Sequence, residues 1–315
     1  MKNKIMLTAL ATIGLLAFTS IFGFAQINTA RSNATASTTD FHDPQNLGLT
    51  VNSDGGENGV FVAPNGLSLY FSGNRAGGEG LGDIWVSQRP MLTSAWGPPQ
   101  NLGTVINTGN VENRPRLSLD GLTMFFNSNR EGSQDIFIST RTNPNDDFSW
   151  TTPVNLGVNI NTPDGSESTP AYFEDPTTGI ATLYFSSDRE GGQGDFDIYQ
   201  STRNANGTFN PAINCAFLNS VARDFMPFPS RDGLEIYLVS DNGGLGGLDI
   251  WVATRGSIYA RWKRPVNVET LNSENDESDP ALSPDSSVLY FGSSREGGSG
   301  GSDLYTATRL CTSRK

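Results

Sequence analysis

Five acidic residues occupy equivalent positions along this 315-residue chain, each at the start of a predicted strand: Glu57, Glu112, Glu167, Asp224 and Glu277. Carboxylates that face one another across a cavity can act as general acid and base, and glycosidases use two of them without any histidine. If the chain is an enzyme, its catalytic carboxylates are expected among Glu57, Glu112, Glu167 and Asp279. A structural role is the alternative, because a group that recurs in every unit can accept hydrogen bonds from backbone amides or neighbouring arginines.

Residues that depart from the repeated pattern are the better candidates for ligand binding. On or near the predicted inner strands these are Arg114, Arg116, Tyr172, Arg223, Phe225 and Asp279. Together they would make one side of a central channel basic and aromatic and another side acidic. Such a mixture suits a protein segment or an oligosaccharide held at the loop-rich face of the channel, although some of these side chains could serve packing alone.

Several kinds of chemistry are excluded by composition. His42 is the only histidine, so neither a Ser-His-Asp triad nor a histidine-rich metal site can assemble at the channel. The formal net charge of −12 argues against nucleic acid, because phosphate binding requires clustered lysine and arginine. Cys215 and Cys311 fall on separate parts of the repeat map and are expected as unpaired thiols.

Glycine-rich loops such as GGEGLGD and GGQGDFD precede one strand of each repeat. A phosphate cradle would need a helix directly after the loop, whereas a strand follows here. Calcium-binding β-roll repeats share this composition but recur about every nine residues. The glycines therefore predict tight hairpins, and no metal or cofactor is expected; a calcium ion held by several aspartate oxygens is the alternative.

The elements that position these residues are five copies of one repeat. Its second strand is formed by LSLYFSGNR (67–75), LTMFFNSNR (122–130), ATLYFSSDR (181–189), LEIYLVSDN (234–242) and SVLYFGSSR (287–295). A third strand follows each of them, beginning at Asp83, Asp135, Asp197, Asp249 and Asp303. A shorter apolar strand precedes each pair and a fourth strand comes after it. Four short strands in units of about 50 residues or more are typical of β-propeller blades.

The fifth repeat lacks its fourth strand, and FHDPQNLGLTVNS (41–53), ahead of the first repeat, matches the missing element. A strand donated from the N-terminal side would join the two ends of the ring and remove an exposed edge. We therefore predict an all-β fold, a single five-bladed β-propeller over residues 41–312 whose N-terminal strand closes the last blade. The blades are expected at residues 56–108, 111–162, 166–220, 223–273 and 276–309, with 41–53 as the closing strand.

The segments LYFSSDREGGQGDFDIY (183–199) and SPDSSVLYFGSSREGGSGGSDLY (283–305) resemble the TolB-like, WD40-like (PD40-type) β-propeller repeat of bacterial cell-envelope proteins. The resemblance extends over nearly all of residues 41–309. It implies the propeller fold, and for function it implies protein-binding propellers, modules fused to peptidoglycan-binding or peptidase domains, and a few carbohydrate-active members. Because one architecture carries many activities, the resemblance does not choose among them.

The N-terminal segment has the features of a signal peptide. Two lysines precede an apolar run over residues 5–22, and residues 23–25 end in the small residue that a signal peptidase needs. We predict that residues 1–25 are removed and that residues 26–40 form a flexible leader; an uncleaved membrane anchor is the alternative. The mature protein is expected to be periplasmic or secreted, without a membrane span and without a cysteine for a lipid anchor.

From the uniform repeat and the missing catalytic groups, our first interpretation is an exported, non-catalytic propeller that binds a protein or glycan partner in the cell envelope. The alternative is a carbohydrate-active enzyme, a glycoside hydrolase or lyase, that uses channel carboxylates. A structural adhesion module of an extracellular matrix is a third hypothesis.

Overall fold

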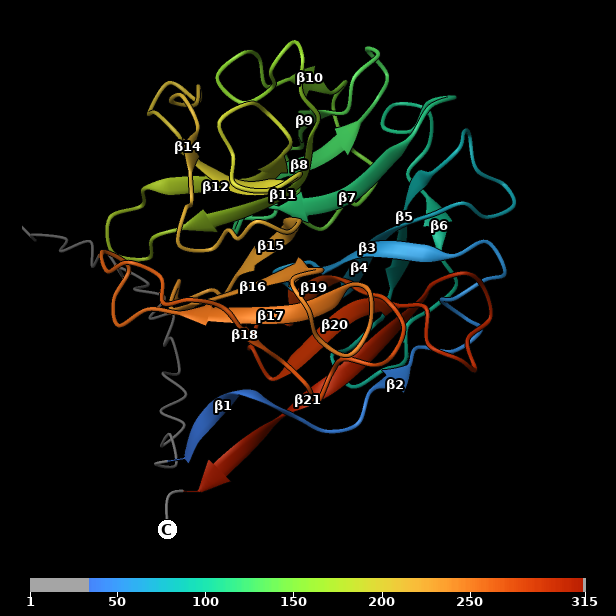
Figure 1. Cartoon of the computed structure of the whole chain (residues 1–315). Coiled ribbons are helices and arrows are strands. Elements are labelled where there is room, and N and C mark those ends of the chain that lie inside the picture. Colours follow the sequence, from blue (N-terminus) through green and yellow to red (C-terminus); the bar gives the residue numbers. More distant parts are fainter. Residues whose placement is uncertain (1–33, 314–315) are drawn as a thin grey trace, which may run out of the picture.

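The computed structural model describes residues 34–313, so the predicted signal peptide over residues 1–25 lies outside the described residues. The described residues form strands β1 to β21, arranged as five antiparallel sheets around a common axis (Figure 1). The predicted all-β, five-bladed propeller is therefore confirmed. Within the described range no helix is long and apolar enough to span a bilayer.

Each of the first four blades consists of four consecutive strands running outward from the axis. Blade 1 contains β3 (Glu57–Val62), β4 (Ser68–Gly73), β5 (Asp83–Gln88) and β6 (Gln100–Asn101). Blade 2 contains β7 (Glu112–Leu117), β8 (Thr123–Ser128), β9 (Asp135–Thr140) and β10 (Val154–Asn155). Blade 3 contains β11 (Glu167–Glu174), β12 (Ala181–Ser187), β13 (Asp197–Thr202) and β14 (Ile213–Asn214). Blade 4 contains β15 (Asp224–Pro229), β16 (Glu235–Ser240), β17 (Asp249–Thr254) and β18 (Val266–Asn267).

Blade 5 is closed by a strand from the other end of the chain, as predicted. Its inner strands are β19 (Glu277–Leu282), β20 (Val288–Ser293) and β21 (Asp303–Ser313), and its outer strand is β2 (Gln45–Asn46). In the register between β2 and β21, Gln45 faces Thr306 and Asn46 faces Tyr305. The ring is thus fastened by hydrogen bonds between segments far apart in the sequence.

An additional strand is formed by the described end of the expected leader. β1 (Ala34–Phe41) pairs with the end of β21, with Ala34 opposite Ser313, so residues 34–40 lie alongside the last blade. β1 can pair there because β21 is longer than its partner β20: the pairing of β21 with β20 ends at Thr308, and β21 continues beyond it. The residues of β21 beyond that point present free backbone groups, which β1 satisfies.

The five innermost strands form a closed ring, in which each contacts the next around the axis (Figure 1). Every one of them is bulged after its second residue, where the register against the neighbouring strand shifts. The third residue has a positive φ in each strand, at Gly59, Arg114, Thr169, Met226 and Asp279. Because non-glycine residues adopt this conformation at a cost of about 1–2 kcal/mol, the surrounding sheets must hold the bulges in place.

We name the two faces of the ring by their connections. The loop face carries the starts of the inner strands and the glycine-rich loops, whereas the turn face carries the tight turns that follow the inner strands. These turns are short: in blade 1, Gly66 donates its N–H to Ala63 at 2.8 Å. Large buried side chains such as Tyr70, Phe126 and Phe185 fill the space between adjacent blades.

Candidate functional site

The carboxylates at the starts of the inner strands are buried and hydrogen-bonded. Glu112 has no exposed surface, and it accepts hydrogen bonds from the Thr108 N–H at 2.6 Å and the Thr108 hydroxyl at 2.8 Å. The hydroxyl of Ser128 donates to it at 2.7 Å, and the guanidinium of Arg130 lies 3.2 Å away. With four partners, this carboxylate joins β7 to the preceding loop and to β8.

The same arrangement recurs at Glu57, Glu167 and Glu277, each 0% exposed and each paired with an arginine. Asp224 differs, because it accepts hydrogen bonds from Ser220 and has no arginine partner among the described residues. Three of the four carboxylates expected to serve catalysis, Glu57, Glu112 and Glu167, therefore stabilise the strand starts. Their burial withholds them from a ligand in the channel.

The aspartates that begin the third strands order the glycine-rich loops. Asp197 accepts hydrogen bonds from two loop amides, those of Gln193 and Gly194, and from the side-chain amide of Asn214 at 2.9 Å. Asp249 and Asp303 repeat this pattern in blades 4 and 5. Over residues 34–313 no three His, Cys, Asp or Glu side chains form a group able to hold a metal ion.

Charged side chains from the bulges of the inner strands meet across the channel. We call the place where Arg114 and Asp279 meet the waist of the channel. Arg114 Nε lies 2.8 Å from Asp279 Oδ1, in an ion pair that joins blade 2 to blade 5. Asp279 is fully buried, and its Oδ2 has no hydrogen-bond partner among the described residues. Arg116 follows two residues after Arg114 and donates to the carbonyl oxygens of Gly59 and Val60. Burial lowers the pKa of Arg116 to about 10, against the opposing effect of Asp279.

A hollow of about 70 Å³ opens at the turn face of the channel, where the inner strands end. We call it the turn-side hollow. Its walls are mainly apolar and include Phe61, Tyr172 and Phe228. Arg116 lines it next to the waist, with its guanidinium 5.7 Å from the Phe61 ring centre and 5.6 Å from that of Phe228. The arrangement offers aromatic faces for apolar surface and a buried cation between them.

The structure does not bring the six expected ligand residues together. Arg114 and Asp279 form the waist, and Arg116 and Tyr172 line the turn-side hollow. Arg223 and Phe225 lie near the start of β15, towards the loop face, where Arg223 forms a half-exposed ion pair with Asp241 and covers the Phe225 ring at 5.7 Å. An extended strand advances about 3.3 Å per residue. Two residues a few positions apart on one inner strand can therefore lie at opposite faces of the ring.

Two charged residues of the hollow escaped the sequence analysis. Glu174 and Arg231 line the hollow, and the side chain of neither makes a hydrogen bond or ion pair with the other described residues. Glu174 ends β11, the blade 3 strand that is longer than its counterparts. Arg231 sits in a turn where the other blades have apolar residues or proline, and this departure from the repeat was the available clue.

No family model and no curated protein sequence matches the chain. Among solved structures, the catalytic domain of the GH62 α-L-arabinofuranosidase from Coprinopsis cinerea is similar with a TM-score of 0.56 and 16% identity, over 89% of this chain and 100% of that chain. The GH43_1 enzyme from Xanthomonas citri, complexed with xylotriose, has a TM-score of 0.55 and 15% identity, over 84% and 89%. TolB from Acinetobacter baumannii has a TM-score of 0.47 and 14% identity, over 81% of this chain and 55% of that chain.

Most of these structural neighbours are glycoside hydrolase propellers. This finding corrects our first interpretation, the non-catalytic binding module, and favours the carbohydrate-active alternative. At these identities the likeness establishes the propeller fold alone, because one architecture carries many activities.

Proposed function

We propose that the chain is a carbohydrate-active enzyme that takes an oligosaccharide at the turn-side hollow. The observation that carries this proposal is the combination of Phe61, Tyr172 and Phe228 with two unpaired charged groups, Glu174 and Arg231, at one end of the channel. Sugar rings bury their apolar faces against aromatic side chains, while a few polar groups fix the hydroxyls. The glycoside hydrolases among the structural neighbours support the same class of ligand.

Glu174 and Asp120 are the carboxyl groups that we propose for the chemistry. Glu174 lines the turn-side hollow, and Asp120 lines an adjacent hollow that shares Pro64 and Leu119 with it. Burial is the main cause of the raised pKa of Tyr172, against the opposing effect of Arg203, and the charges of Glu174 and Asp120 add to the rise. Asp120 accepts hydrogen bonds from the Ser118 hydroxyl at 2.5 Å and the Leu122 N–H at 2.9 Å, whereas Glu174 accepts none from the described residues. Unlike environments suit a general base and a general acid, so we assign the base to Asp120 and the acid to Glu174.

The test is a polysaccharide panel incubated with the mature protein and assayed for reducing ends and for unsaturated products. Glu174→Gln is expected to lower the rate at least 100-fold, because it removes the proton donor and keeps the shape. Glu296→Gln, an exposed substitution on a glycine-rich loop, serves as the control and should leave the rate unchanged. Product formation that survives Glu174→Gln contradicts the assignment of the acid, and absence of both turnover and binding over the whole panel contradicts the proposal.

We also propose that the protein is exported and works in the periplasm or outside the cell. The support is the lysine-flanked apolar run over residues 5–22 followed by a small residue at the expected cleavage position. N-terminal sequencing of the protein recovered from cell fractions tests this proposal. A mature chain that begins near Gln26 is the expected result, and a chain that keeps residues 1–25 in the cytoplasm contradicts it.

A further inference from the structure

In four blades an arginine after the second strand fills a slot on the loop face. In blade 2, the Arg130 guanidinium stacks over Phe126 at 5.3 Å and Phe137 at 5.0 Å. It donates to the carbonyl oxygen of Ile106 at 2.6 Å and pairs with Glu112 at 3.2 Å. The equivalent contacts are made by Arg75, Arg189 and Arg295. The slot therefore recognises a guanidinium by two ring faces, a carbonyl oxygen and a carboxylate.

Blade 4 keeps this slot and lacks its arginine. Asn242 occupies the position, and its N–H donates to Ser240 at 3.2 Å as the Arg130 N–H does to Ser128 at 3.1 Å, so the backbone course is the same. The shorter side chain leaves a cavity of about 100 Å³. The residues that line it include the counterparts of the slot in the other blades: Leu218, Asp224, Leu238, Ser240 and Trp251.

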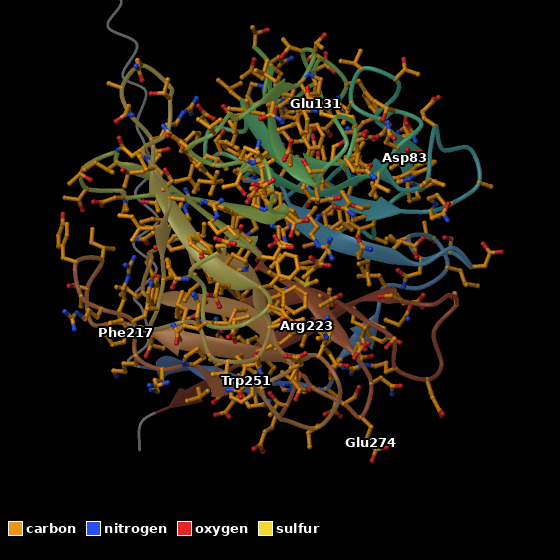
Figure 2. The ribbon with its side chains drawn as sticks, turned by 45° about the horizontal axis from the view of Figure 1, so that its top comes forward. Asp83, Glu131, Phe217, Arg223, Trp251 and Glu274 are labelled. Carbon is orange, nitrogen blue, oxygen red and sulfur yellow. The ribbon has the colours of Figure 1, made fainter. Side chains whose placement is uncertain are left out.

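The Trp251 ring of blade 4 has no arginine from residues 34–313 stacked over it, and it is more exposed than its counterparts on the other third strands. Trp85 and Phe137, beneath arginines in blades 1 and 2, are 6% and 1% exposed, whereas Trp251 is only partly buried. Figure 2 labels Trp251 in blade 4, together with Arg223. Asp224 likewise has no guanidinium partner among the described residues, in contrast to its glutamate counterparts.

We propose that this cavity, the blade 4 slot, binds a guanidinium cation brought by a ligand. The cation would stack on Trp251 and face the carboxylate of Asp224 and the carbonyl oxygen of Leu218, as the chain's own arginines do elsewhere. A planar guanidinium fits a flat ring and several acceptors better than a compact ammonium does. The source is either a small guanidinium compound or an arginine side chain of a partner protein.

Arg264 is the competing occupant within the chain. It lines the mouth of the blade 4 slot, but its exposed guanidinium makes no ring contact or ion pair with the residues that the structure describes. The counterparts of Arg264 in blades 1 and 2 are Pro98 and Thr152, so an arginine here is specific to blade 4. An experiment must therefore separate filling by Arg264 from filling by an external ligand.

The experiment is calorimetric titration of the full mature chain, at low ionic strength, with agmatine and with the peptide acetyl-Gly-Arg-Gly-amide. Saturable binding of agmatine at least tenfold tighter than binding of cadaverine, its diamine counterpart, is expected. Binding of the peptide as well would identify the source as a partner protein, and binding of agmatine alone would identify a small compound.

Two variants make the result specific to the slot. Asn242→Arg should abolish binding, because the slot is then filled as in the other blades, and Trp251→Leu should weaken it at least tenfold. Circular dichroism verifies that both variants are folded. Unchanged binding in Asn242→Arg overturns the proposal, and so does binding that appears only after Arg264→Ala, because the chain would then occupy its own slot. This outcome is independent of the proposed enzymatic activity, which concerns the opposite face.

Discussion

Arg141 and Asp147 form a buried ion pair, with Nη1 of the arginine 2.9 Å from Oδ1 of the aspartate. Both belong to the segment that follows β9 in blade 2. The same carboxylate accepts hydrogen bonds from Ser68 at 2.6 Å, Tyr70 at 2.5 Å and Gln88 at 2.7 Å, all in blade 1. One carboxylate thus fastens a loop of blade 2 to two strands of blade 1.

Asp147→Ala is expected to lower the free energy of unfolding by about 3–5 kcal/mol, because it leaves a buried guanidinium and the two buried hydroxyl donors of Ser68 and Tyr70 without this acceptor. Urea unfolding followed by fluorescence measures this change. Asp241→Ala is the matched control, since it breaks the exposed Arg223–Asp241 pair and should cost at most about 1 kcal/mol. Equal effects of the two substitutions would contradict the fastening role of Asp147.

The same carboxylate predicts a pH dependence of stability. Burial alone would raise the pKa of Asp147, but hydrogen bonds from Ser68, Tyr70, Arg141 and Gln88 outweigh it and hold the pKa below the ordinary value of 3.8. The unfolded chain then takes up this proton at a higher pH than the folded chain, so the stabilisation is complete above the ordinary pKa and is lost as pH falls through the folded one. Between about pH 5 and pH 2 the unfolding free energy should fall less steeply in Asp147→Asn than in the natural protein. Parallel pH profiles would contradict the prediction.

The bulge of β3 predicts intolerance of a single methyl group. Gly59 has a φ of +63°, and a Cβ built there would lie 2.8 Å from the Cα of Arg114 on the adjacent inner strand. Gly59→Ala should therefore destabilise the fold by about 1–3 kcal/mol, measured by urea unfolding. Gly109→Ala, where a Cβ meets nothing within 4 Å, should change stability by less than about 0.5 kcal/mol. A Gly59→Ala variant as stable as the control would show that the inner ring is more compliant than its geometry indicates.

The repeat pattern was sufficient to predict the blades, because every inner strand begins at a repeated acid and every third strand at a repeated aspartate. The starts of β3 at Glu57 and β5 at Asp83 illustrate this agreement. Ring closure by β2 was equally visible, since FHDPQNLGLTVNS repeats the fourth-strand pattern. The pairing of β1 could not be predicted from the repeat. It depends on how far β21 extends beyond β20, and the repeat pattern does not give this length.

The site was less predictable, because its location depends on which end of a strand a residue occupies. Arg114 and Arg116 are two positions apart and looked equivalent, yet the bulge sends Arg114 to Asp279 at the waist and Arg116 to the rings of the turn-side hollow. The repeated acids were correctly suspected of a structural role, which their partners now explain. Asn242 stands in the sequence where the other four repeats have an arginine, but only the neighbouring Trp251 and Asp224 show what its short side chain leaves open.

Cys215 is a free thiol and is expected to resist alkylation in the folded protein. Burial raises its pKa to about 12, against the opposing charge of Arg255. At pH 8 roughly one thiol in ten thousand is then ionised, and the thiolate is the species that reacts. Iodoacetamide labelling, followed by mass spectrometry of the separate cysteine peptides, should modify Cys215 only after denaturation. Labelling of this partly buried residue in the native protein at the rate seen in the unfolded one would contradict its raised pKa.

The closing strand β2 predicts a sharp boundary for N-terminal truncation. Asn46 donates its side-chain amide to Asp303 at 2.8 Å, and the fully buried Val51 packs in the core next to blade 5, so both stabilise the last blade. Removing residues 1–53 should lower the melting temperature by about 10 °C or more relative to removing residues 1–40, which leaves β2 in place. The exposed edge of β21 should also promote association, detectable by sedimentation, because unpaired strand edges join with one another. If the two truncated proteins melt at the same temperature and stay monomeric, closure by β2 contributes little to the stability of the ring.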